Sequence, residues 1–228
     1  MPATAASLSA VTTQGPAAAA PGLRLHDVEN PMTRYVAVRD RRLQGGVPKR
    51  GGLSIINTSA NTTLSSLFGQ VRSALGSHER FDAMFILCHG YAGRNLRAAV
   101  SMDAGGEGLQ LCAEGVLHSN VARWTAIAGK VNHIVVYSCA AGNTERGNEG
   151  STADGRYLMG ALAIHTEANV YAADRIQWYQ THGGLANGRF EFGDWEGNLW
   201  RFPPSGEPPT MVSRAPVEFA DVMAGTAP

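Results

Sequence analysis

The sequence predicts an α/β fold, and two segments of the chain lead to that prediction. Each is a run of apolar residues that ends beside small residues: FDAMFILCHG, which closes on His89 and Gly90, and VNHIVVYSCAAG, which includes Cys139. Such runs are typical of strands covered on both faces, as in parallel sheets. Because segments with helical periodicity alternate with the strands, we expect a mostly parallel sheet with helices on both faces, a three-layer sandwich.

The remaining elements are predicted from the periodicity of apolar residues. Further strands are expected over YVAVRD (35–40), LSIINTS (53–59) and NVYAA (169–173). Helices are expected from Asn61 or Thr62 through Leu75, from Ser119 or Asn120 through Ile127, and over about 153–166. The segments LQLC and GVL predict a small hairpin after the first long strand. Strands and helices thus alternate along most of the chain.

Length and composition limit the domain organisation. A chain of 228 residues forms one domain or at most two small ones. Residues 1–25 are rich in Ala, Ser, Thr and Pro and are expected to form a disordered tail, because they cannot bury enough apolar surface. Residues 26–228 then form the folded domain, with a Pro-rich C-terminal tail from about residue 203.

Charge and cysteine content exclude several classes of function. Nineteen basic residues balance 19 acidic ones, so we expect neither nucleic acid nor a membrane surface as a partner. The three cysteines are an odd number without paired spacing, which predicts a reducing compartment and a cytoplasmic protein. The N-terminus lacks the charge and apolar run of a signal peptide. No zinc-ligand spacing occurs, and we expect no metal and no cofactor.

His89 and Cys139 are the candidate catalytic residues. Taken alone, each residue is explained equally well by a structural role. The histidine can form hydrogen bonds with the backbone, and a cysteine is most often a buried apolar residue. Together they place an imidazole and a thiol at the carboxyl edge of one sheet, where α/β sheets hold ligands. A thiol attacks as its thiolate, and an imidazole is the base that produces one. Backbone N–H groups at Gly90 and Cys139 are expected to face a developing oxyanion.

The order of the two residues separates this chain from several enzyme classes. In α/β hydrolases, glutaminase-type amidotransferases and papain-like enzymes the nucleophile precedes the histidine, whereas here His89 precedes Cys139 by 139 − 89 = 50 residues. This order resembles that of the caspase-like cysteine peptidases (clan CD). In both, an apolar strand leads to His-Gly, and about fifty residues later a second apolar strand ends in a small residue and Cys. VYSCAAG, and the helix and strand after it, are more similar to bacterial CHAT-type domains than to animal caspases, whose Gln-Ala-Cys-x-Gly is absent.

The resemblance covers about residues 53–179 and implies a cysteine endopeptidase. It implies that Cys139 is the nucleophile, that His89 is the general base and acid, and that the backbone of Gly90 and Cys139 forms the oxyanion hole. It implies no obligatory third acid. The partners implied are a protein or peptide substrate and a regulatory protein or processing event that activates the enzyme. The absence of Gln-Ala leaves the residue preference at the cleaved position open.

Other residues are candidates for substrate binding or processing. Asp174 follows the predicted strand 169–173 at the same sheet edge, where it either favours a basic substrate residue or stabilises a turn. Arginines near the first strand are the opposite candidates, for an acidic substrate residue: Arg34, Arg39 and Arg42. The polar loop 140–152 contains Glu145-Arg146, a conceivable site of self-cleavage or simply a connection.

Two alternatives to a peptidase remain open at this point. The first is a non-catalytic relative that uses the same fold for binding or scaffolding; the intact His-Cys pair disfavours it. The second is a doubly wound domain that binds a small molecule. Neither a Gly-x-Gly-x-x-Gly fingerprint nor a phosphate-loop Gly-Lys-Ser/Thr supports this second reading.

Overall fold

The computed structural model describes residues 35–92, 97–98, 105–144, 148–182 and 188–227, all within the compact unit that begins at Met32. The predicted tail 1–25, Arg34 and the Glu145-Arg146 pair lie outside these residues. Seven strands form the main sheet: β1 (Tyr35–Asp40), β2 (Leu53–Thr58), β3 (Phe81–Leu87), β7 (Val131–Tyr137), β8 (Asn169–Ala173), β11 (Leu199–Phe202) and β12 (Thr210–Val212).

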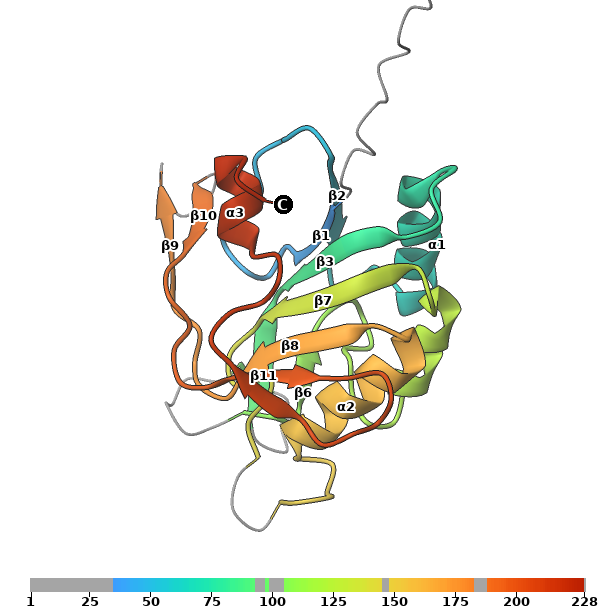
Figure 1. Cartoon of the computed structure of the whole chain (residues 1–228), viewed down its shortest axis with the longest axis vertical. Coiled ribbons are helices and arrows are strands. Elements are labelled where there is room, and N and C mark those ends of the chain that lie inside the picture. Colours follow the sequence, from blue (N-terminus) through green and yellow to red (C-terminus); the bar gives the residue numbers. More distant parts are fainter. Residues whose placement is uncertain (1–34, 93–96, 99–104, 145–147, 183–187, 228) are drawn as a thin grey trace, which may run out of the picture. The chain divides into compact units, whose positions relative to one another are not determined.

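The sheet is mostly parallel, as predicted. Its strand order is β12-β11-β8-β7-β3-β1-β2 (Figure 1). The strands from β2 to β8 in this order run parallel, while β11 and β12 are antiparallel additions at one edge. The two apolar runs of the sequence form β3 and β7, which pair with each other at the centre. The prediction of an α/β fold with buried central strands is therefore confirmed.

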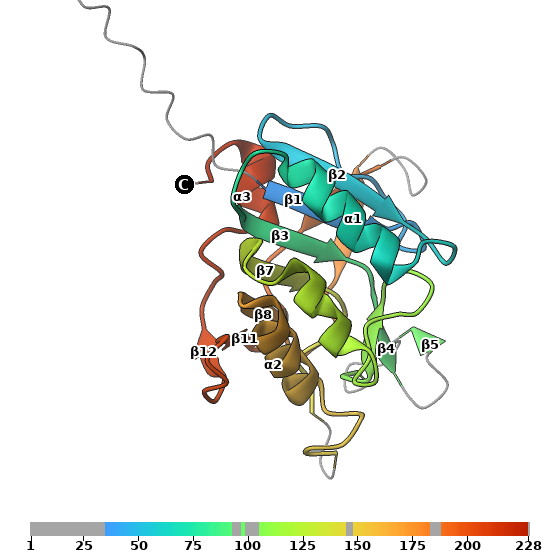
Figure 2. The ribbon, with the colours of Figure 1, turned by 90° about the vertical axis from the view of Figure 1, so that its right-hand side faces the viewer.

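One face of the sheet is covered by most of the helical structure (Figure 2). It carries α1 (Leu64–Leu75), the 3-10 helix η1 (Val121–Ile127) and α2 (Gly155–Thr166). Thr63 caps α1, because its side chain accepts a hydrogen bond from the Ser66 N–H, so the helix begins within two residues of the predicted position. The helix expected from Ser119 or Asn120 is present as a 3-10 helix. The predicted α2 is confirmed almost to the residue.

The opposite face is covered by a strand ribbon and one short helix. The ribbon consists of β9 (Tyr179–His182) and β10 (Arg189–Phe192), and the helix is α3 (Phe219–Ala224). Their aromatic residues pack on the sheet; the rings of Phe85 and Phe219, for example, lie 5.6 Å apart and edge to face. Helices thus lie on both faces, but within the described residues α3 is the only one on this side (Figure 1). Both α3 and β12 fall in the segment after residue 203 that the sequence marks only by its prolines.

The chain reverses its direction of winding at β1. It leaves β1 toward β2 on one side and then returns to β3 on the other, so the carboxyl ends of β1 and β3 form a topological switch point. Ligands of open α/β sheets bind in such crevices. Beyond β3 the chain enters a small three-stranded sheet of β4 (His89–Ala92), β5 (Arg97–Ala98) and β6 (Gly108–Gln110). The bridge between Leu109 and Val116 confirms the predicted hairpin.

No described helix has both the length and the apolar character required to cross a membrane.

Candidate active site

His89 and Cys139 follow neighbouring parallel strands by the same number of residues. The last register pair of β3 and β7 is Leu87 with Tyr137, and each candidate lies two positions further along. The backbone pairing continues past these strand ends, since the Cys88 N–H donates to the Tyr137 carbonyl over 3.4 Å. The two segments therefore stay adjacent at the carboxyl edge of the sheet. Although both side chains are described, the structure has no hydrogen bond between them.

The His89 ring is held by a backbone carbonyl at the switch point. Its Nε2 atom lies 3.3 Å from the carbonyl oxygen of Arg42, which follows β1. Because a carbonyl oxygen can only accept, Nε2 is the donor in this contact, and in the neutral tautomer Nδ1 then carries the lone pair. The contact thus fixes the orientation of the ring.

Asp40 fixes the turn that supplies this carbonyl. Asp40 is fully buried at the end of β1 and accepts hydrogen bonds from Arg42 Nε (2.7 Å) and Nη2 (2.8 Å) and from the Cys112 N–H (3.0 Å). Arg42 also donates to the Cys112 carbonyl over 2.7 Å. Burial by itself raises the pKa of Asp40, but the hydrogen bonds and charge of Arg42 outweigh it and hold that pKa below its ordinary value. A charged, buried Asp40 therefore stabilises the turn next to His89.

The thiol of Cys139 is half-buried and poorly ionised in this state. Its sulfur lies 3.9 Å from the carbonyl oxygen of Gln177, to which the S–H donates. Burial raises the pKa of the Cys139 thiol, and the charge of Glu196 adds to the rise. Backbone contacts at Gln177, Cys139 and Gly90 act in the opposite direction and lower the pKa. The backbone of Gly90 and Cys139 thus acts on the sulfur, and an oxyanion hole formed by their N–H groups stays a prediction.

Only glycine fits at position 90. A β-carbon there would lie 2.1 Å from the Cys139 carbonyl oxygen and 3.3 Å from the Ser138 hydroxyl. The lack of a side chain is what lets the backbone after β3 approach the backbone after β7. This approach brings position 90 against the backbone of the residue that carries the sulfur.

Asp174 lies at the end of β8 and has three hydrogen-bond donors around it. It accepts from the Asn198 N–H (2.9 Å), from Asn198 Nδ2 (3.1 Å) and from Trp200 Nε1 (3.0 Å). Burial raises the pKa of Asp174, but these bonds outweigh it and lower the pKa overall. The carboxylate therefore joins the end of β8 to the start of β11. A role in substrate binding stays a prediction.

The two described arginines that were candidates for an acidic substrate are engaged within the fold. Arg42 is paired with Asp40. Arg39 donates to the Leu43 carbonyl over 3.0 Å and lies 5.7 Å from the centre of the Phe190 ring. Arg39 thus joins the turn after β1 to the ribbon, and Arg42 joins it to the segment at Cys112.

Three residues of the site were missed by sequence reasoning. Asp40 could have been found, because it ends a predicted strand at the same sheet edge as the candidate pair. Gln177 and Glu196 lie in connections without periodicity, and only the folded chain brings them to Cys139. Cys88 and Cys112 are buried, and both belong to the core cluster that includes α1 and α2.

Among the described residues, no group of His, Cys, Asp and Glu has the arrangement of a metal site. No family model, curated protein or solved structure matches the chain. The case for a function therefore depends on the geometry of this site.

Proposed function

We propose that the chain is a caspase-like cysteine endopeptidase with Cys139 as nucleophile and His89 as general base and acid. The observation that carries the proposal is the contact between His89 Nε2 and the Arg42 carbonyl. It orients the ring so that Nδ1 of the neutral tautomer is available as the proton acceptor, at a strand end that is adjacent to that of Cys139. A base held by a third group beside a nucleophile is the arrangement that nucleophilic catalysis requires.

The reaction follows from these groups. His89 Nδ1 takes the proton of the thiol, and the Cys139 sulfur attacks the carbonyl carbon of a peptide bond. The N–H groups of Gly90 and Cys139 stabilise the oxyanion, as backbone donors at such a site do. As the bond breaks, His89 returns the proton to the leaving amine and a thioester remains. Water, deprotonated by His89, then releases the acid and restores the thiol.

An activating step is part of the proposal. In the present state the thiol donates to the Gln177 carbonyl and its pKa is raised by burial, so the thiolate is scarce. A substrate, a regulatory protein or a processing event would have to turn the thiol toward His89. We expect this to occur in the cytoplasm, as the cysteine content predicts.

The test compares single substitutions in one cleavage assay. Cys139→Ala and His89→Ala should each abolish hydrolysis of a mixed peptide library while the circular dichroism spectrum is unchanged. Cys88→Ala is the matched control, because its thiol is buried in the core and takes no part in the reaction. Full activity of either active-site variant would overturn the assignment.

A non-catalytic module is the second candidate, and the raised pKa of the Cys139 thiol favours it. In that case the site binds a peptide without cleaving it. A peptide with an electrophilic group separates the two candidates, because it labels an activated Cys139 much faster than iodoacetamide does. If the ratio of the labelling rate with the peptide to that with iodoacetamide is the same in wild type and His89→Ala, the protein is a binding module.

A further inference from the structure

A carboxylate is among the causes that raise the pKa of the Cys139 thiol. Glu196 lies in the connection from β10 to β11, and its charge disfavours the thiolate of Cys139. An enzyme that uses a thiolate gains nothing from an anion at this place in its empty state. The position of Glu196 therefore requires another explanation.

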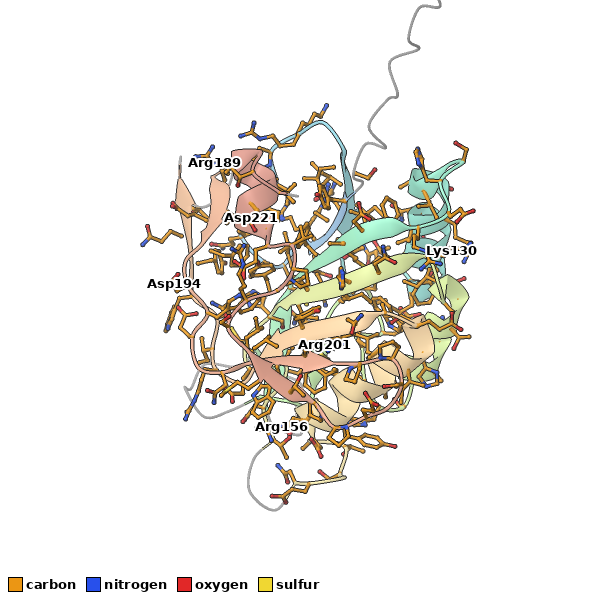
Figure 3. All side chains as sticks on the ribbon, viewed as in Figure 1. Lys130, Arg156, Arg189, Asp194, Arg201 and Asp221 are labelled. Carbon is orange, nitrogen blue, oxygen red and sulfur yellow. The ribbon has the colours of Figure 1, made fainter. Side chains whose placement is uncertain are left out.

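Gln177 links this carboxylate to the sulfur. Its backbone carbonyl accepts the Cys139 thiol, and its side-chain Nε2 donates to Glu196 Oε2 and, over 3.3 Å, to the Asp194 carbonyl. The Trp178 N–H also donates to Glu196 Oε2, over 3.3 Å. Asp194 lies on the segment that leads out of β10, at the left of Figure 3. Gln177 therefore contacts both groups: its backbone carbonyl contacts the Cys139 sulfur, and its side chain holds the Glu196 carboxylate.

This cluster has more acceptors than donors. Because both partners of the Gln177 amide are acceptors, its NH₂ must face them, and Oε1 is left buried without a donor. Gln177 as a whole is only 4% exposed. Glu196 Oε1 likewise accepts no hydrogen bond from any residue that the structure describes, and Glu196 forms no ion pair there. A cationic donor is the group that would satisfy both the charge and the free acceptors.

The other charged residues near Glu196 are engaged elsewhere or exposed, so Glu196 is the carboxylate available to bind a cation. Asp174 is bound by Asn198 and Trp200. Arg175 lies beyond Gly197, where a β-carbon would overlap its side chain, and it lowers the pKa of Asp174. Asp194 contributes its backbone carbonyl to the cluster and is itself exposed.

We propose that Glu196 determines specificity and selects a substrate with a cationic side chain, lysine or arginine, beside the scissile bond. The inference rests on the proposed peptidase function and adds its substrate class. The cation pairs with Glu196 and cancels the charge that disfavours the thiolate. Binding of the correct substrate therefore also makes the nucleophile easier to ionise, which ties selection to activation.

Two peptides that differ in one group test the substrate class. Arginine and its neutral analogue citrulline are placed before the scissile bond of otherwise identical peptides. Wild type should cleave the arginine peptide more efficiently in kcat/KM, on the order of tenfold or more. Glu196→Gln should remove most of that difference, and Glu196→Lys should favour an aspartate peptide. Glu207→Gln, an exposed carboxylate in the turn before β12, should leave the preference unchanged. Cleavage without a preference for arginine would overturn the inference but not the peptidase.

A chemical readout keeps the inference testable if no peptide is cleaved. Cationic and neutral methanethiosulfonates each form a disulfide with the Cys139 sulfur and release methanesulfinate. The cationic reagent should react faster relative to the neutral one in wild type than in Glu196→Gln. Equal ratios in the two proteins would reject a cation site at Glu196, whereas a clear difference without any cleavage would support the site and reject the peptidase.

Discussion

Gly90 and Cys139 lie so close together that a β-carbon at position 90 would be 2.1 Å from the Cys139 carbonyl oxygen. No real β-carbon approaches a backbone oxygen this closely, so one of the two segments must move if any side chain is present. The contact joins the ends of the two central strands. It makes the position of the sulfur depend on the absence of a side chain after His89.

The first prediction concerns this contact. Gly90→Ala should lower the free energy of unfolding by about 1–3 kcal/mol, as overpacking does, and should abolish the reaction of Cys139 with substrate. Gly69→Ala is the control: Gly69 lies inside α1 with nothing within 4 Å of the added carbon, and alanine there should stabilise by about 0.5–1 kcal/mol. Urea denaturation and thiol labelling measure the two effects. If Cys139 in Gly90→Ala is labelled at the wild-type rate, the close contact between positions 90 and 139 is contradicted.

The second prediction concerns the pH dependence of the thiol. Burial and the charge of Glu196 raise the pKa of Cys139, so the thiolate forms at higher pH than in an ordinary cysteine. Other titratable groups that interact with this thiol are Cys88 and Tyr179. The alkylation rate of Cys139 in the free protein should therefore still rise above pH about 8.5, where an ordinary thiol is half ionised.

Glu196→Gln should move this alkylation profile to lower pH, because it removes an anion beside the forming thiolate. Glu207→Gln should not move it. The other two thiols do not obscure the measurement, since Cys88 and Cys112 are buried and burial raises the pKa of Cys112 to about 12. A profile that levels off near neutral pH in wild type would show that the resting thiol is already activated.

The third prediction concerns the buried Asp40. Asp40→Asn leaves the Arg42 charge without its partner and should cost about 2–4 kcal/mol at pH 7, toward the low side of values for broken buried pairs because Arg42 is partly exposed. The pKa of Asp40 is lowered in the folded state, so its stabilisation is complete above its unfolded pKa near 4 and is lost as the pH falls through the lower, folded value.

The gap in stability between wild type and Asp40→Asn should consequently narrow below pH about 4, as measured by urea denaturation across pH. Glu79→Gln, at an exposed carboxylate, is the matched control and should show only a small gap. A gap of constant size at all pH values would mean that Asp40 is not ionised in the folded protein.

The fourth prediction separates Asp174 from Glu196. Asp174→Asn weakens the hydrogen bonds from Asn198 and Trp200 and should lower stability by about 1–2 kcal/mol. If Glu196 selects the cation, the ratio of arginine to citrulline cleavage should be unchanged in this variant. Loss of the ratio in Asp174→Asn, with Glu196→Gln unaffected, would assign the cation site to Asp174 instead.

Local patterns in the sequence were sufficient for much of the fold. Apolar runs predicted β3 and β7, and helical spacing with a polar cap predicted α1 and α2, because these elements are recorded in residues close together in the chain. The C-terminal part was harder to foresee. β12 and α3 are short and surrounded by proline and glycine, and they owe their stability to packing on the sheet.

By itself, the sequence determined that a histidine and a cysteine end two buried strands of an α/β sheet, because apolar runs and the residues that end them are local properties. The tertiary structure decided which backbone groups and charges surround that pair. The carbonyl of Arg42, held by Asp40, and the carboxylate of Glu196, held by Gln177, come from segments distant in the chain. Strand order and loop packing bring them together, and neither leaves a periodic pattern in the sequence.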